Sequence, residues 1–184
     1  MSDIKAYKSK SKSVSFSQIL PRDYTFDEAR TVIYEMALNG ASELMRRHVI
    51  TGNVNIFVGY THDEHPPTKG GMRLGVTTAL ASFITEAALE LYDRTTDRNT
   101  LIRRLGIGFG DVCDEGCEDY DLFTNFDEVE KEKTAQQAVL GIRERFGKNA
   151  VLNGINLMPE GTQRERNTFI GGHRAGYDDA RRES

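Results

Sequence analysis

The sequence predicts an α+β fold of four strands and two helices in the order β-α-β-β-α-β, with both helices on one face of the sheet, followed by a C-terminal helix and tail. Four segments between residues 8 and 112 alternate apolar with small or polar side chains, as strands do. Two further segments carry apolar residues at helical spacing on one side only. Such a sandwich leaves the second face of its sheet open to solvent.

The first strand is predicted at residues 8–17, where lysines, Val14 and Phe16 alternate with serines, so that Val14 and Phe16 face the core. Residues 20–24, which include Pro21, are expected to break the chain. A long helix is predicted at residues 25–49 because Thr25 and Glu28 have the spacing of a capping box. The apolar residues that follow them repeat at helical spacing up to Val49.

The later elements follow from the same two periodicities. Residues 53–60 are predicted as a strand with Val54, Ile56, Val58 and Tyr60 inward. A loop that includes Gly70 and Gly71 precedes a short strand at residues 72–77, and Thr77 or Thr78 is expected to cap a second helix that ends near Asp93. The strand at residues 100–112 is expected to place Leu105, Ile107 and Phe109 inward and Gly106, Gly108 and Gly110 outward.

Composition excludes several classes of protein. The sequence holds no apolar run of about 18 residues, which a membrane span needs, and its first residues lack the apolar stretch of a signal peptide. Two cysteines do not make a disulfide framework. These observations predict a soluble, cytoplasmic protein.

The charge of the chain is segregated. The formal net charge is −4, but residues 111–132 alone hold ten acidic side chains and one basic one, so the rest of the chain is net positive. We therefore divide the chain into a domain at residues 1–112, an acidic linker at 113–132, and a helix and tail at 133–184. The helix is expected from about Asp127 to Phe146, with an apolar stripe and Gly147 as its stop. The stripe consists of Ala135, Ala138, Val139, Ile142 and Phe146.

The open sheet face is the candidate functional surface. It is predicted to carry serines, Asn55, Arg73, Thr77 and glycines, with lysines at one rim and arginines at the other. Small side chains let another molecule come close, and hydroxyl and amide groups can donate to phosphate oxygens. The alternative interpretation is a sheet face that is merely solvated.

Two segments carry a resemblance to a known family. Residues 12–24 (KSVSFSQILPRDY) and 102–112 (IRRLGIGFGDV), together with Asp121-Leu-Phe, Glu165-Arg-Asn and Ile170-Gly-Gly-His, resemble the little-finger domain of Y-family translesion DNA polymerases. The similarity is greatest to the UmuC-like proteins of Gram-positive bacteria, the ImpB/MucB/SamB family. It extends over residues 8–176, and the family's little finger has the β-α-β-β-α-β order predicted above.

The resemblance implies a DNA-binding C-terminal domain of an error-prone polymerase, which grips the primer–template phosphate backbone during DNA repair, lesion bypass and the SOS response. The residues that it implies as DNA contacts are Lys10, Lys12, Ser13, Ser15, Ser17, Arg73, Arg103 and Arg104. The chain departs from the family at the outer face of the second strand. There it has Asn55, Phe57 and Gly59 where many relatives have basic residues, and Phe57 could instead contact a neighbouring domain.

Catalysis is not expected from this chain. The resemblance implies that the parent polymerase uses Mg²⁺ held by carboxylates of a palm domain, and this sequence supplies no such carboxylates. We therefore predict no catalytic residue, metal site or cofactor in this chain. Cys113 and Cys117 with His62 and His65 have the composition of a zinc site, but the tight histidine spacing does not favour one.

The acidic linker suggests a second partner. Residues 119–123 lie where family members carry a peptide that binds the sliding clamp, and Leu122 and Phe123 would fill its apolar pocket. Asp119 and Tyr120 depart from the motif, and the two apolar residues could instead fold back onto the body. The alternative function is thus a protein-interaction module that tethers the polymerase to the clamp or to other repair proteins. An RNA-binding domain is a third possibility, although the sheet lacks paired stacking aromatics.

Overall fold

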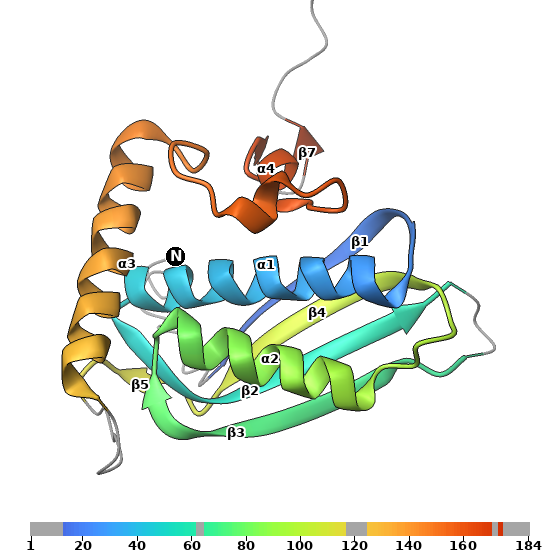
Figure 1. The fold of residues 1–184 in the computed structure, drawn as a ribbon, viewed down its shortest axis with the longest axis horizontal. Helices are drawn as coiled ribbons and strands as arrows, with labels where there is room; N and C mark the ends of the chain where they lie inside the picture. The colour runs from blue at the N-terminus through green and yellow to red at the C-terminus, as the bar shows by residue number, and fades with distance from the viewer. Residues whose placement is uncertain (1–12, 62–64, 117–124, 171–172, 175–184) are drawn as a thin grey trace, which may run out of the picture.

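The computed structural model describes residues 13–61, 65–116, 125–170 and 173–174. Within them the predicted order is confirmed, as β1 (Val14–Tyr24), α1 (Phe26–Arg46), β2 (Val49–Tyr60), β3 (Thr68–Thr78), α2 (Ala81–Thr95) and β4 (Ile102–Gly110). The strands pair antiparallel in the order β1-β4-β2-β3, and α1 and α2 cover one face of the sheet (Figure 1). No helix among these residues is long and apolar enough to cross a membrane.

The hydrophobic core lies between this sheet and the two helices. Most predicted inward residues of the central strands are buried: Val54, Ile56 and Val58 in β2, and Leu105, Ile107 and Phe109 in β4. Tyr60, also predicted inward, is partly buried and packs against the core. Gly40 of α1 lies so close to Phe109 of β4 that a methyl group on the glycine would overlap the Phe109 ring. The lack of a side chain at Gly40 thus allows α1 to pack closely against β4. The helical side of the sheet is therefore fully packed, and the other face remains open.

The predicted start of α1 is confirmed, but its predicted end is wrong. Thr25 and Glu28 form the capping box. The helix ends at Arg46 because His48 adopts a left-handed backbone conformation (φ 56°) that reverses the chain. Val49, expected in the helix, instead opens β2, and its pairing with β5 (Cys113–Asp114) extends the sheet.

Glu28 gives this helix start a pH dependence. The Arg22 guanidinium donates to both Glu28 carboxylate oxygens (2.7 and 3.2 Å), and with the Thr25 backbone N–H it lowers the pKa of Glu28 to about 2. Because the pKa of Glu28 is lower in the folded state than the unfolded value of 4.5, the ionised carboxylate stabilises the fold at pH values above 4.5. This contribution is lost as the pH falls from 4.5 towards 2. Because Arg22 is half exposed, we expect at most about 1 kcal/mol.

The Glu28→Gln variant is therefore expected to lose less stability than the wild type between pH 4.5 and pH 2. The free energy of unfolding, measured by urea denaturation across this range, checks it. Glu86→Gln, on the exposed side of α2, controls for the loss of one surface carboxylate. An equal slope in Glu28→Gln and the wild type would contradict the assignment.

The expected chain break at residues 20–24 is wrong. β1 continues through Pro21 to Tyr24, with a register shift against β4 between Ile19 and Tyr24. β1 is an edge strand, where a proline without an N–H is tolerated. The predicted loop at Gly70 and Gly71 is likewise part of a strand, since β3 begins at Thr68.

The two glycines of β3 permit close packing on both sides of the strand. A methyl group on Gly70 would lie 3.0 Å from Leu91 Cδ1 of α2, and one on Gly71 would lie 2.6 Å from Asn55 Oδ1. Gly70 therefore lets α2 approach the sheet, and Gly71 leaves room for the Asn55 amide on the open face.

The cap of α2 also differs from the prediction. The N-cap residue is Leu80, and Thr78 lies in β3, where its hydroxyl accepts from the Leu80 N–H (3.1 Å). The first amides of α2 instead donate to α3 (Phe126–Phe146): Ala81 N–H to Gln136 Oε1 and Ser82 N–H to Glu132 Oε1, both at 2.8 Å. A distant helix thus supplies the cap.

α3 ends at Gly147 as predicted, with a φ of 97° there. The apolar stripe expected on this helix is not packed against the body, because Val129 is the one buried residue of α3. Ile142 and Phe146 are exposed, and the helix contacts the body through polar side chains such as Gln136.

The tail after α3 returns along α1 and β1 (Figure 1). It contains the short elements η2 (Gly154–Leu157), α4 (Gln163–Arg166), β6 (Phe169–Ile170) and β7 (His173–Arg174). Glu35 of α1 is 1% exposed and accepts hydrogen bonds from three tail residues. A buried carboxylate therefore fastens the tail to the domain.

Candidate nucleic-acid interface

The register of the four strands arranges the open face in rows. One row crosses the sheet from β1 to β3 as Ser15, Gly108, Asn55 and Gly71. The next row consists of Ser17, Gly106, Phe57 and Lys69. The alternation predicted from the sequence therefore places serines on one edge strand and glycines in the centre.

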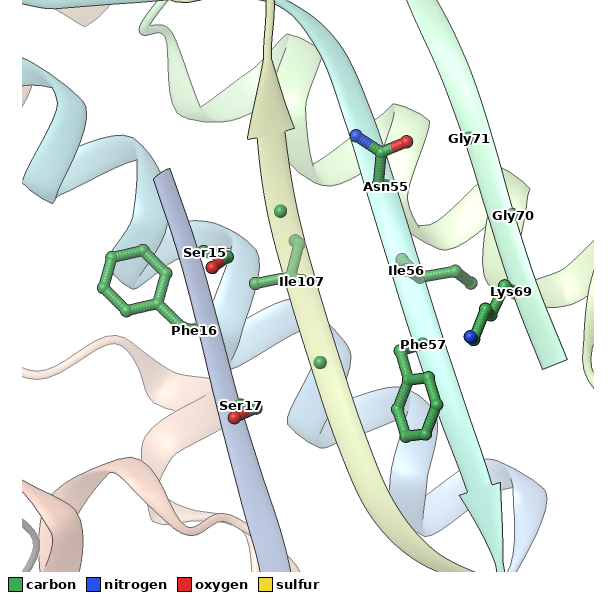
Figure 2. Close-up of a pocket in the computed structure, with 12 residues that line it drawn as sticks. Ser15, Phe16, Ser17, Asn55, Ile56, Phe57, Lys69, Gly70, Gly71 and Ile107 are labelled. Carbon is green, nitrogen blue, oxygen red and sulfur yellow. The ribbon is translucent and has the colours of Figure 1, made fainter. Parts of the chain in front are cut away.

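The glycines of β4 form the floor of a hollow of about 670 Å³ on this face. In Figure 2 the side chains of Ser15 and Ser17 lie on one side of β4, and Asn55 and Phe57 lie on the other. A methyl group on Gly108 would lie 3.8 Å from the Cβ atoms of both Asn55 and Ser15, an ordinary contact distance. The floor is thus bare backbone that a second molecule can approach.

The charges on this face have one sign. The outward positions defined by the register include Lys69, Arg73 and Arg104, and none of these positions holds a carboxylate. All three cationic side chains are exposed. The face therefore attracts anions, and Ser15, Ser17 and Asn55 add donors suited to phosphate oxygens.

An irregularity in β4 brings a fourth cation to the same end of the sheet. Ile102 and Leu105 are both fully buried although they are three residues apart, which strict alternation does not allow. The register against β2 shifts at this point, so Arg103 and Arg104 both lie at the surface between them. Arg103 is partly neutralised by Asp23, whose Oδ1 is 3.7 Å from its Nη1. Among the described residues, Arg104 makes no ion pair.

The structure thus places most of the predicted contact residues on or beside one face. Ser13, Ser15 and Ser17 are exposed in or beside β1, Arg73 is exposed in β3, and Arg103 and Arg104 follow the start of β4. Lys10 and Lys12 lie outside the described residues. Lys69 was missed because the sequence pattern assigned residues 61–71 to a loop. Its position four residues before Arg73, at the same parity, is the signal that identifies it.

Two other predictions fall wholly or partly outside the described residues. Leu122 and Phe123 lie outside the described residues, so the clamp-binding peptide remains a prediction. Cys117 and His62 of the disfavoured zinc site also lie outside the described residues. Within the described part of the chain, no group of three or more His, Cys, Asp and Glu side chains is placed to hold a metal ion.

Comparison with known proteins identifies relatives over most of the chain. Residues 11–122 match the model of the impB/mucB/samB family C-terminal domain. UvrX of Bacillus subtilis, a candidate UV-damage repair protein, is 28% identical over 166 residues, which are 86% of this chain and 38% of the relative. DNA polymerase IV of Acetivibrio thermocellus is 25% identical over 154 residues, 83% of this chain and 38% of that protein. The chain thus spans about two fifths of these relatives.

Solved structures give a looser match. The little-finger domain of PolIV, determined in complex with the β-clamp processivity factor, is 11% identical with a TM-score of 0.43, over 61% of this chain and 99% of that one.

Proposed function

This chain belongs to the impB/mucB/samB family of C-terminal domains, and we propose that its open sheet face grips the phosphate backbone of primer–template DNA for a lesion-bypass polymerase. The observation that carries the proposal is the composition of that face. Lys69, Arg73 and Arg104 stand at outward positions that include no carboxylate, around a bare floor of glycines.

The chemistry of each part suits a phosphate backbone. Arginine guanidinium groups bind phosphate in a fork of two N–H donors, and the hydroxyls of Ser15 and Ser17 add weaker donors along β1. The hollow over Gly106 and Gly108 lets the backbone lie close to the sheet. Phosphate contacts position a protein without reading base sequence, as an enzyme that meets damaged templates requires.

The parent enzyme's activity belongs to the same proposal. Relatives of more than twice this length are named for DNA polymerase IV and UV-damage repair, and we propose that this domain serves a DNA polymerase in repair. Mg²⁺ and its carboxylate ligands would then belong to the palm domain of that polymerase.

Replacing Arg103 and Arg104 together with alanine is expected to weaken DNA binding and to reduce its salt dependence. Each phosphate contact contributes about −0.9 to the slope of log K against log salt, so the slope should become shallower by about 2. At low salt we expect a loss of affinity of about tenfold or more. Fluorescence anisotropy with a labelled primer–template across a salt series measures both quantities.

The matched control is Arg94→Ala in α2, on the covered side of the sheet, where Arg94 is exposed and lies 3.9 Å from Glu90. It removes an arginine without touching the open face, so its slope should stay close to that of the wild type. If Arg94→Ala changed the salt slope as much as the double replacement of Arg103 and Arg104, the effect would come from the net charge of the chain alone. If the wild-type chain failed to bind DNA even at low salt, the tether function would be favoured instead.

A further inference from the structure

Phe57 is an aromatic side chain on the open face of the sheet. It lies outward in β2, half-buried, and it is the one aromatic residue among the outward positions that the register defines. The apolar core lies on the opposite face, where Ile56 and Val58 are buried. Phe57 therefore adds nothing to the core, and its ring is available to a second molecule.

Two glycines lie beside this ring. A methyl group on Gly59 would lie 3.3 Å from Phe57 Cε1, and one on Gly106 would lie 3.3 Å from Phe57 Cβ. The ring therefore lies along β2 beside these two glycines, and Figure 2 shows it on the open face of the sheet. A side chain at either glycine would crowd the ring.

Two cations flank the ring. Lys69, which pairs with Phe57 across β2 and β3, holds its Nζ atom 6.0 Å from the ring centroid. On the other side, a methyl group on Gly59 would lie 3.1 Å from Arg104 Cβ as well as close to the ring. An aromatic face with a cation on either side is the arrangement that stacks a nucleobase while holding the adjoining phosphates.

We propose that Phe57 is a stacking platform for an unpaired base, so that the domain binds single-stranded template as well as duplex backbone. The inference rests on the proposed DNA-binding function. Bases inside a duplex are stacked on one another and do not offer their faces, so the partner of this ring must be unpaired.

The position of the ring favours a base over a neighbouring protein domain. Gly106 and Lys69, its neighbours across the sheet, and Gly59, the next outward residue along β2, offer no apolar side chain. The centre of a protein interface is depleted of charged residues, whereas Phe57 lies among cations. One aromatic ring between positive charges matches an anionic strand with exposed bases.

The test uses two substitutions in the 184-residue chain. Phe57→Leu keeps an apolar side chain but removes the ring, and Phe57→Trp keeps a ring. Because the natural sequence has no tryptophan, the new indole would be the sole one and its fluorescence would report directly on stacking. Binding is measured to a single-stranded oligothymidylate and to a relaxed, closed circular duplex, which has neither ends nor unpaired bases.

We expect Phe57→Leu to bind the oligothymidylate about tenfold more weakly, a loss that clearly exceeds any change in its affinity for the duplex. We expect Phe57→Trp to keep wild-type affinity and to lose fluorescence on adding the single strand but not the duplex. Equal affinities of Phe57→Leu and wild type for both DNAs would overturn the inference, leave the backbone grip intact, and assign the ring to a protein contact. An equal loss for both DNAs would overturn it too. Absence of all DNA binding by the wild type would overturn the proposed function together with this inference.

Discussion

Replacing Glu35 with alanine is expected to release the C-terminal tail from the domain. The Glu35 carboxylate accepts from Asn156 Nδ2 (2.8 Å) and from the backbone N–H groups of Thr162 (2.7 Å) and Gln163 (3.2 Å). An alanine would leave these donors without their acceptor in a buried site, and each unsatisfied donor costs about 1–3 kcal/mol. We expect a loss of about 2–4 kcal/mol in the docking of the tail.

Limited trypsin digestion measures this release, because Arg164 and Arg166 lie in the docked tail. Cleavage at these arginines should become rapid in Glu35→Ala while residues 14–110 stay intact. Glu160→Ala is the matched control, since it removes a single tail contact, the hydrogen bond from Thr31 Oγ1 to Glu160 Oε1 (3.2 Å), and should remain protected. Wild-type protection in Glu35→Ala would mean that other contacts hold the tail.

The docking of this tail could not be predicted from the sequence. Glu35 lies beside the apolar stripe of α1, and a glutamate there is ordinarily taken as solvent-exposed. Its partners are more than 120 residues away and come mainly from backbone N–H groups, which carry no sequence signal. The tail elements are also only two to four residues long, too short for a periodic pattern.

Elements whose signals are local were predicted well. The capping box at Thr25 and Glu28 and the alternation of buried residues and glycines in β4 are properties of neighbouring residues. The errors arose where distant contacts decide. Pro21 is compatible with a strand because β1 lies at an edge, and α2 needs no local cap because Glu132 and Gln136 of α3 supply one.

The candidate interface shows the same division between local signals, which could be predicted, and contacts between strands, which could not. Alternation places Ser15 and Ser17 correctly, because one parity faces the core. It could not reveal that an irregular register exposes Arg103 and Arg104 together, since that shift depends on the pairing with β2. Lys69 was missed although it shares the parity of Arg73, because glycines at 70 and 71 favour a turn over a strand. The close approach of Leu91 and Asn55, which accounts for these glycines, is visible only in the fold.

Replacing Gly108 with glutamate is expected to abolish DNA binding without unfolding the domain. Gly108 lies in the floor of the hollow, and an added Cβ would meet Ser15 and Asn55 at an ordinary 3.8 Å. The fold should therefore tolerate a side chain there. A carboxylate about 4 Å from a phosphate near a protein surface is repelled by about 4 kcal/mol, so we expect affinity to fall at least a hundredfold at low salt, measured by anisotropy with the labelled primer–template.

Two variants separate the causes of that loss. Gly108→Gln has the same shape without the charge, so it should bind more weakly than wild type because the backbone can no longer approach the floor, but better than Gly108→Glu. Gly141→Glu in α3 adds the same charge at a position with nothing within 4 Å of its new Cβ, and it should bind like wild type. If Gly108→Glu bound as tightly as Gly141→Glu, DNA could not lie in the hollow, and the grip would have to be sought at the arginine-bearing end of β4 alone.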